Sequence, residues 1–254
     1  MTALDLTPDA HPAPRWDRVL RHARVEASLT LRNGEQLLLA LAIPLGLLVW
    51  GSTLGRGLGW NQVEFPASVL ALGLWSTGFT SLAIITAFER RYGVLERLAA
   101  TPLTRTDLLV GKALATIAIA AGQAVLVAGV AGVLGWRPTP TLVQTLLMLA
   151  AAALALVVFA SWALALASVL RAEATLGVAN LIYLLLAVLG GLIVPLETLP
   201  DGVRGALALL PTGALGEALR GWSVGSFDPL LLLPLSGWAL LSALIARKVF
   251  RWMS

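Results

Sequence analysis

The sequence contains no cysteine, and only 13% of its 254 residues are charged. Without cysteine, the chain has no disulfide, no thiolate metal site, no cysteine nucleophile and no CxxCH haem attachment. Soluble domains carry about 25% charged residues, so a water-soluble fold of this chain would lack the polar surface to cover itself. With 58% hydrophobic residues and a mean hydropathy of +0.85, the composition predicts an integral membrane protein.

Catalytic motifs are also scarce. The two histidines, His11 and His22, precede the first long apolar run, and there is no HExxH sequence. Ser223 therefore has no histidine nearby to activate it as an intramembrane protease would require. Residues 201–204 faintly resemble the DGxxAR motif of lipid phosphotransferases, but Asp228 is the one further aspartate nearby. The sequence thus disfavours intramembrane catalysis and shows no metal site.

A P-loop is missing as well. The motif GxxxxGK[ST] cradles phosphates with backbone amides and a lysine. The one Gly-Lys pair is Gly111-Lys112, but Ala113 follows it and Thr106 stands where the first glycine is needed. We therefore expect this chain to bind no cofactor.

Long uncharged runs dominate the remaining sequence, with lengths from 18 to 33 residues. A helix needs about 20 apolar residues to cross a bilayer, and backbone in lipid must satisfy its own hydrogen bonds. The runs do not alternate as β-barrel strands do. We predict an all-α integral membrane fold with six transmembrane helices. The predicted spans are about 36–55, 66–88, 109–135, 141–170, 174–196 and 229–248.

The distribution of basic residues predicts the topology. Six spans place both termini on one side, and 14 of the 18 basic residues fall in the two terminal segments and the loops after spans two and four. By the positive-inside rule both termini should be cytoplasmic, in a multi-pass protein of the cell membrane. The interior of each span is uncharged, which disfavours ion-coupled transport. Membrane lipid, and not nucleic acid, is the expected partner of the basic residues.

Three segments outside the spans have predictable character. Residues 1–14 contain three prolines and are expected to be a flexible cytoplasmic tail. Residues 15–32 are expected to form an amphipathic interfacial helix, the alternative being a packed helix with one solvated face. Residues 197–227 are too broken to span and too apolar for a free loop, which predicts an outer re-entrant or interfacial helix pair. The predicted apolar face of the first helix consists of Trp16, Val19, Leu20, Ala23, Ala27 and Leu31.

The charged segment 89–112 lies between spans two and three and reads ERRYGVLERLAATPLTRTDLLVGK. We expect a short helix over 89–100, ended at Thr101-Pro102 because proline disfavours helical geometry in the preceding residue. Thr104 and Asp107 have the spacing of a capping box, which predicts the start of the next helix. The pattern predicts a compact charged projection, although a loop that only sets topology is the alternative.

This segment closely resembles the one that follows the second span in ABC-2 type transporter permeases. The outer segment adds a weaker match through its prolines and Arg220, and the resemblance covers about residues 15–254 as one transmembrane domain. The matching residues are Glu89, Arg90, Gly93, Leu95, Glu96, Arg97, Leu98, Pro102, Leu103, Leu108, Gly111 and Lys112, with Pro195, Leu199, Pro200, Pro211 and Arg220 further on.

The resemblance implies that residues 89–108 are a coupling segment that docks on an ABC ATPase. It also implies two ATPase copies and a second permease chain, either identical or related. The ATPase-coupling residues implied are Glu89, Arg90, Arg91, Gly93, Glu96, Arg97, Pro102 and Lys112.

The implied function is the export of a lipophilic or amphiphilic compound, such as a drug, a natural product or a lipid-like molecule. Export of a polysaccharide or glycolipid is the alternative within the family, and a non-transporting membrane scaffold is the alternative outside it. Trp75, Asn180 and Tyr183 are candidates for the substrate path, although packing or interhelical hydrogen bonding would equally account for such residues within spans.

Overall fold

A computed structural model describes residues 12–55 and 61–249 of the chain. Within these ranges every regular element is a helix, which confirms the predicted all-α class. Most of the predicted tail over 1–14 lies outside the described residues. The last three of its residues, Pro12 to Pro14, are exposed and precede the first helix.

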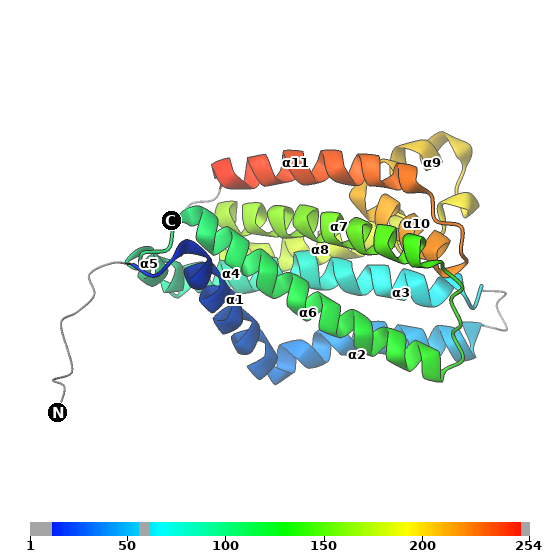
Figure 1. The fold of residues 1–254 in the computed structure, drawn as a ribbon, viewed down its shortest axis with the longest axis horizontal. Coiled ribbons are helices and arrows are strands. Elements are labelled where there is room, and N and C mark those ends of the chain that lie inside the picture. Colours follow the sequence, from blue (N-terminus) through cyan, green and yellow to red (C-terminus); the bar gives the residue numbers. More distant parts are fainter. Residues whose placement is uncertain (1–11, 56–60, 250–254) are drawn as a thin grey trace, which may run out of the picture.

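Long helices run side by side to form a bundle (Figure 1). The long elements are α2 (Gly34–Thr53), α3 (Glu64–Trp75), which continues through the π-helix η2 (Ser76–Ser81) into α4 (Leu82–Arg91), α6 (Arg105–Val133), α7 (Leu142–Val169), α8 (Ala172–Leu189) and α11 (Leu232–Val249). The remaining elements are α1 (Arg15–Arg32), α5 (Val94–Ala99), η3 (Leu196–Thr198), α9 (Asp201–Ala208), α10 (Pro211–Ser223) and η4 (Pro229–Leu231).

Five helical stretches in the described part of the chain are long and apolar enough to cross a membrane. They confirm a multi-pass protein and correspond to predicted spans two to six. They are Glu64–Arg91, Arg105–Val133, Leu142–Val169, Ala172–Leu189 and Pro229–Val249. Predicted span one coincides with α2, in which Leu41–Thr53 is an apolar helical stretch, and the sixth crossing stays a prediction.

The predicted fifth span ends earlier than expected. Helix α8 stops at Leu189, whereas the uncharged run extends to residue 196. The adjacent Gly191 has a φ of +77°, a left-handed conformation that favours glycine because it has no Cβ. A Cβ on Gly190 would lie 2.4 Å from the Leu186 carbonyl oxygen. The Gly190-Gly191 pair therefore breaks the helix within an otherwise apolar run.

The second span forms the centre of the bundle. In its most apolar window 78% of the residues are buried, against 28% or fewer in the other four spans. Trp75 is completely buried, stacked on Phe79 with ring centroids 4.4 Å apart and in edge contact with Phe159 at 4.7 Å. The outer helices instead leave large apolar side chains such as Val125 and Leu142 exposed, as expected of helices that face lipid.

Helix α1 begins and helix α11 ends at the same end of the bundle. Helices α1 and α5 gather there with the last turn of α11, whereas α9 and α10 lie at the opposite end (Figure 1). We refer to these as the α5 end and the α9 end. An even number of crossings would produce this arrangement.

Helix α1 packs on α6 with only part of its apolar surface. Val19, His22 and Ala23 are buried, and a Cβ on Gly111 of α6 would lie 2.5 Å from Cδ2 of His22. The absence of a side chain at Gly111 thus permits the close approach. Trp16 and Leu20 stay 62% and 44% exposed, so α1 keeps a free apolar flank beside its packed face. Its placement at a membrane interface stays a prediction.

The segment between spans five and six contains the predicted helix pair, α9 and α10. Helix α10 is largely buried and packs on α3 and α7, whereas α9 has no buried residue. The pair turns tightly, since a Cβ on Gly213 would lie 2.1 Å from the Leu207 carbonyl oxygen. The segment is therefore part of the folded bundle, and its depth in a membrane stays a prediction.

Candidate functional site

The projection at the α5 end begins with a sharp turn at Gly93. This residue has a φ of +68°, and its N–H donates to the Arg90 carbonyl at 3.1 Å, which ends α4. The single helix predicted over 89–100 is therefore wrong. Residues 89–91 continue the second span, and α5 begins only at Val94. The left-handed turn at Gly93, which a glycine adopts without steric cost, separates the two.

The turn between α5 and α6 matches the sequence prediction. Asp107 N–H donates to Thr104 Oγ1 and Thr104 N–H donates to Asp107 Oδ2, both at 3.2 Å, so the capping box that starts α6 is formed. The buried Asp107 carboxylate also accepts a hydrogen bond from Arg15 Nε at 2.7 Å. Arg18 donates to the Pro102 carbonyl at 2.7 Å. Helix α1 is thereby fixed to the turn that joins α5 and α6.

Behind the projection lies a buried ion cluster. Lys112 is 1% exposed, and its Nζ lies 2.8 Å from Glu26 Oε2 and 2.5 Å from Glu89 Oε2. His22 is also buried, with Nε2 3.5 Å from Glu26 Oε1. The cluster joins α1, α4 and α6. Breaking a buried ion pair by removing one partner costs about 3–5 kcal/mol, so these three helices are strongly held together.

The predicted coupling residues are thus divided. Glu89 and Lys112 are internal and bind each other. Arg90 donates to the carbonyls of Ser168 and Leu170, and Arg91 pairs with Glu173, so both arginines turn toward the α7–α8 connection. The remaining four lie on the projection itself. Glu96, Arg97 and Pro102 are exposed there and Gly93 is partly exposed.

A groove of about 640 Å³ opens beside the second span, between α1, α2, α4 and α8. Of the predicted path residues, Asn180 and Tyr183 line it. Trp75 does not, because it is buried in the core, where its Nε1 donates to the Tyr183 carbonyl at 3.3 Å. The structure thus brings two of the three candidates together at one cavity.

The π-helix η2 supplies hydroxyl groups to this groove. Ser76, Thr80 and Ser81 line it, and Thr80 Oγ1 is buried with no hydrogen-bond partner in the described part of the chain. π-helical turns are rare and frequently occur at functional sites. Sequence reasoning missed these residues. The available signal was the hydroxyl-rich stretch 76–81, reading STGFTS, within an apolar span.

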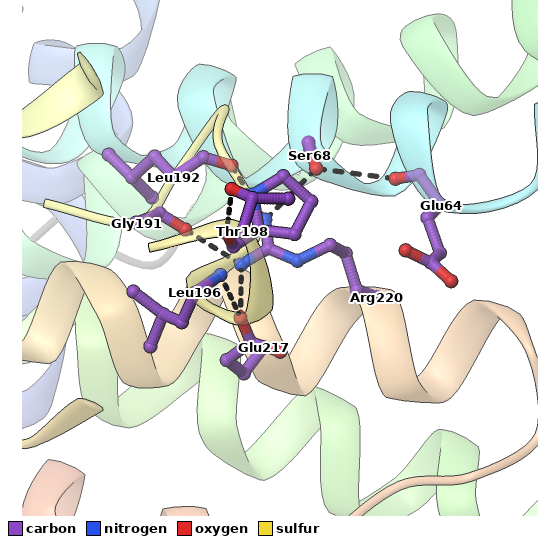
Figure 2. Close-up of polar contacts among 9 residues, drawn as sticks. Glu64, Ser68, Gly191, Leu192, Leu196, Thr198, Glu217 and Arg220 are labelled. Atoms are coloured by element: carbon purple, nitrogen blue, oxygen red, sulfur yellow. Dashed lines mark hydrogen bonds and ion pairs between the residues drawn. The ribbon is translucent and has the colours of Figure 1, made fainter. Parts of the chain in front are cut away.

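At the α9 end, Arg220 holds the broken end of α8 in place. It is 3% exposed and donates to Ser68 Oγ at 3.0 Å, to the Leu192 and Gly191 carbonyls at 2.9 and 2.8 Å, and to Glu217 at 2.7 Å (Figure 2). Arg220 therefore ties α10 to α3 and to the turn after α8. The sequence indicated this residue only through the family resemblance.

The fold and these sites can be compared with known proteins. No curated protein matches the chain. The family model described as ABC-2 type transporter matches residues 21–222, which include α5, the buried ion cluster, the groove and Arg220. The chain therefore belongs to the ABC-2 type transporter family.

Proposed function

We propose that the chain is the permease subunit of an ABC exporter whose ATP is hydrolysed, with Mg²⁺, by a separate subunit. The observation that carries the proposal is the projection at the α5 end. Its tip exposes Glu96, Arg97 and Pro102, while its base is fixed by the buried Lys112 cluster. An exposed charged tip on a rigid base suits a partner that pushes on the membrane domain.

The coupling residues would act in two groups. Glu96, Arg97 and Pro102 would contact the ATPase, whereas Glu89 and Lys112 would transmit its movement. Because Lys112 joins α1, α4 and α6, a displacement of α5 would move these helices together. In this proposal the α5 end and both termini face the cytoplasm, as the basic residues predict.

A second permease chain and two ATPase copies would complete the transporter. Asn180 is exposed on α8 within a predicted span, and its neighbours Leu181 and Leu184 are also exposed. A polar side chain in lipid is costly and is usually directed toward protein or a water-filled cavity. Asn180 also lines the groove, and we propose that this side of α8 faces the second chain, either identical or related.

The groove favours a lipophilic or amphiphilic cargo. Its surface is mainly apolar, with aliphatic residues that include Ile43, Ile84, Ile85 and Leu176, and its polar groups are mostly uncharged. A polysaccharide or glycolipid would be expected to use a series of aromatic side chains, and the groove supplies few. A scaffold without transport activity would not require a cavity of this size.

The test is purification of the chain with whichever ABC ATPase its genomic neighbourhood encodes, followed by measurement of ATP hydrolysis in lipid. The proposal predicts stable co-purification and hydrolysis stimulated by apolar compounds. Co-purification without stimulation by any compound would favour the scaffold. Failure of the ATPase to bind would contradict the proposal.

A further inference from the structure

The groove has an unbalanced charge at its α5 end. Glu26 and Glu89 line it there, and no lysine or arginine is among its lining residues in the described part of the chain. Lys112 lies behind both carboxylates and can neutralise one of them. Burial lowers the pKa of His22, so this histidine is neutral at pH 7 and does not balance the second carboxylate.

The nearby arginines do not supply the missing charge. Arg90 extends toward the carbonyl groups at the end of α7, and Arg91 is neutralised by Glu173. Arg91 lies over the Tyr92 ring at 5.9 Å, but it is not part of the groove wall. The α5 end of the groove therefore has a net charge of about −1 when both carboxyl groups are ionised.

Two aromatic side chains also line the α5 end of the groove. Phe88 and Tyr92 both line the groove, with ring centroids 6.1 Å apart. The face of an aromatic ring attracts cations. Further along, the buried Thr80 hydroxyl has no partner among the residues described, and such a group is costly unless a guest or water satisfies it. The groove thus combines anionic, aromatic and unsatisfied polar groups on a mainly apolar surface.

We propose that the groove binds a lipophilic cation, with its charge against Glu26 and Glu89 and its apolar body along the apolar surface. The inference rests on the proposed exporter function and names the class of its cargo. The volume of about 640 Å³ falls within the range of drug-sized sites. Because the same carboxylates hold Lys112, the cargo would contact the cluster that links the groove to α5.

Tetraphenylphosphonium and tetraphenylborate test this inference directly, because they have nearly the same size and shape and opposite charge. Binding is measured by equilibrium dialysis on the purified chain in phosphatidylcholine nanodiscs, with the uptake of empty nanodiscs subtracted. We expect saturable binding of the phosphonium and none of the borate. Glu26→Gln and Glu89→Gln should each weaken phosphonium binding by about tenfold, whereas Glu197→Gln, at the α9 end, should not change it.

Equal binding of the two ions, or unchanged phosphonium affinity in the folded Gln variants, would overturn the inference. If Glu89→Gln does not fold, the phosphonium affinity of Glu26→Gln tests the inference by itself, because this variant keeps the Lys112–Glu89 pair intact. The experiment uses the permease alone. Its failure would exclude a cationic cargo without bearing on the exporter proposal, which depends on ATPase binding.

Discussion

At the scale of single residues, Lys112 shows that a sequence motif does not reveal whether its side chains are buried or exposed. The sequence places it beside Gly111 in a segment that resembles a coupling region, and the structure buries it between Glu26 and Glu89. These partners are 86 and 23 positions away. No local pattern shows such distant pairing, so the exposure of Glu96 and the burial of Lys112 could not be distinguished beforehand.

The two lysines of the chain provide a matched test of this burial. Lys112→Met leaves two carboxylates facing each other without a cation, and should destabilise the fold by about 3–5 kcal/mol, lowering the melting temperature by about 10 °C. Lys248→Met makes the same chemical change at an exposed position and should have little effect. Thermal unfolding in detergent compares them, and equal melting temperatures would refute the role assigned to the cluster.

At the scale of elements, the predictions from run length were the most successful. The start and end of α7 agree with the predicted span within one residue. Arg171 bounds the apolar run at its end, and the Thr141–Gln144 capping box starts the helix inside the run. Two helices end earlier than predicted, and each ends at glycine: α4 before Gly93 and α8 before Gly190-Gly191. The π-helix η2 was not predictable, since a single widened turn does not change the apolar pattern of a largely buried span.

Helix α5 is the element on which coupling depends. Glu96→Lys and Arg97→Glu reverse exposed charges, so each should weaken co-purification of the ATPase by at least tenfold while the melting temperature of the permease stays unchanged. Arg204→Glu reverses an exposed charge on α9 and serves as the control. Full ATPase binding by both α5 variants would show that α5 is not the docking element.

Helix α1 should be less stably packed in acid. Burial lowers the folded-state pKa of His22, opposed by Glu26 and supported by Lys112, and Glu89 completes the cluster. The unfolded state therefore binds a proton more readily. The stability that neutral His22 contributes is complete above pH about 6.5 and is lost as the pH falls below it.

Melting temperatures between pH 7.5 and 5.5 test this sign. The native chain should lose more stability across this interval than His22→Gln, in which His11 remains. An identical pH dependence in the two proteins would show that His22 does not carry the effect.

At the scale of the whole molecule, the arrangement is a buried central span surrounded by lipid-facing helices, with a charged projection at one end and the α9–α10 pair at the other (Figure 1). The sequence predicted the apolar helices, the projection and the helix pair because apolar runs and charged segments alternate, but it did not predict which span is central. It did not predict the groove, which is formed by side chains from α1, α2, α4 and α8. Contacts between elements so distant in sequence leave no periodic pattern.

The absence of cysteine makes the orientation directly measurable. A single cysteine replacing Arg97 should react with a membrane-impermeant maleimide only when the cytoplasmic face is accessible, because the α5 end is proposed to lie there. A single cysteine replacing Arg204, at the α9 end, should react only from the outside. The opposite labelling pattern would invert the proposed topology, and labelling of both from one side would contradict a membrane-spanning bundle between them.

The central claim is that ATP hydrolysis by a partner drives movement of a compound through this permease. The most direct measurement is ATP-dependent uptake of a fluorescent lipophilic compound into inside-out proteoliposomes containing the permease and its ATPase. The account predicts uptake with the native chain and its loss with Glu96→Lys. Uptake that persists with Glu96→Lys, or an assembled ATPase that hydrolyses ATP while no compound moves, would contradict it.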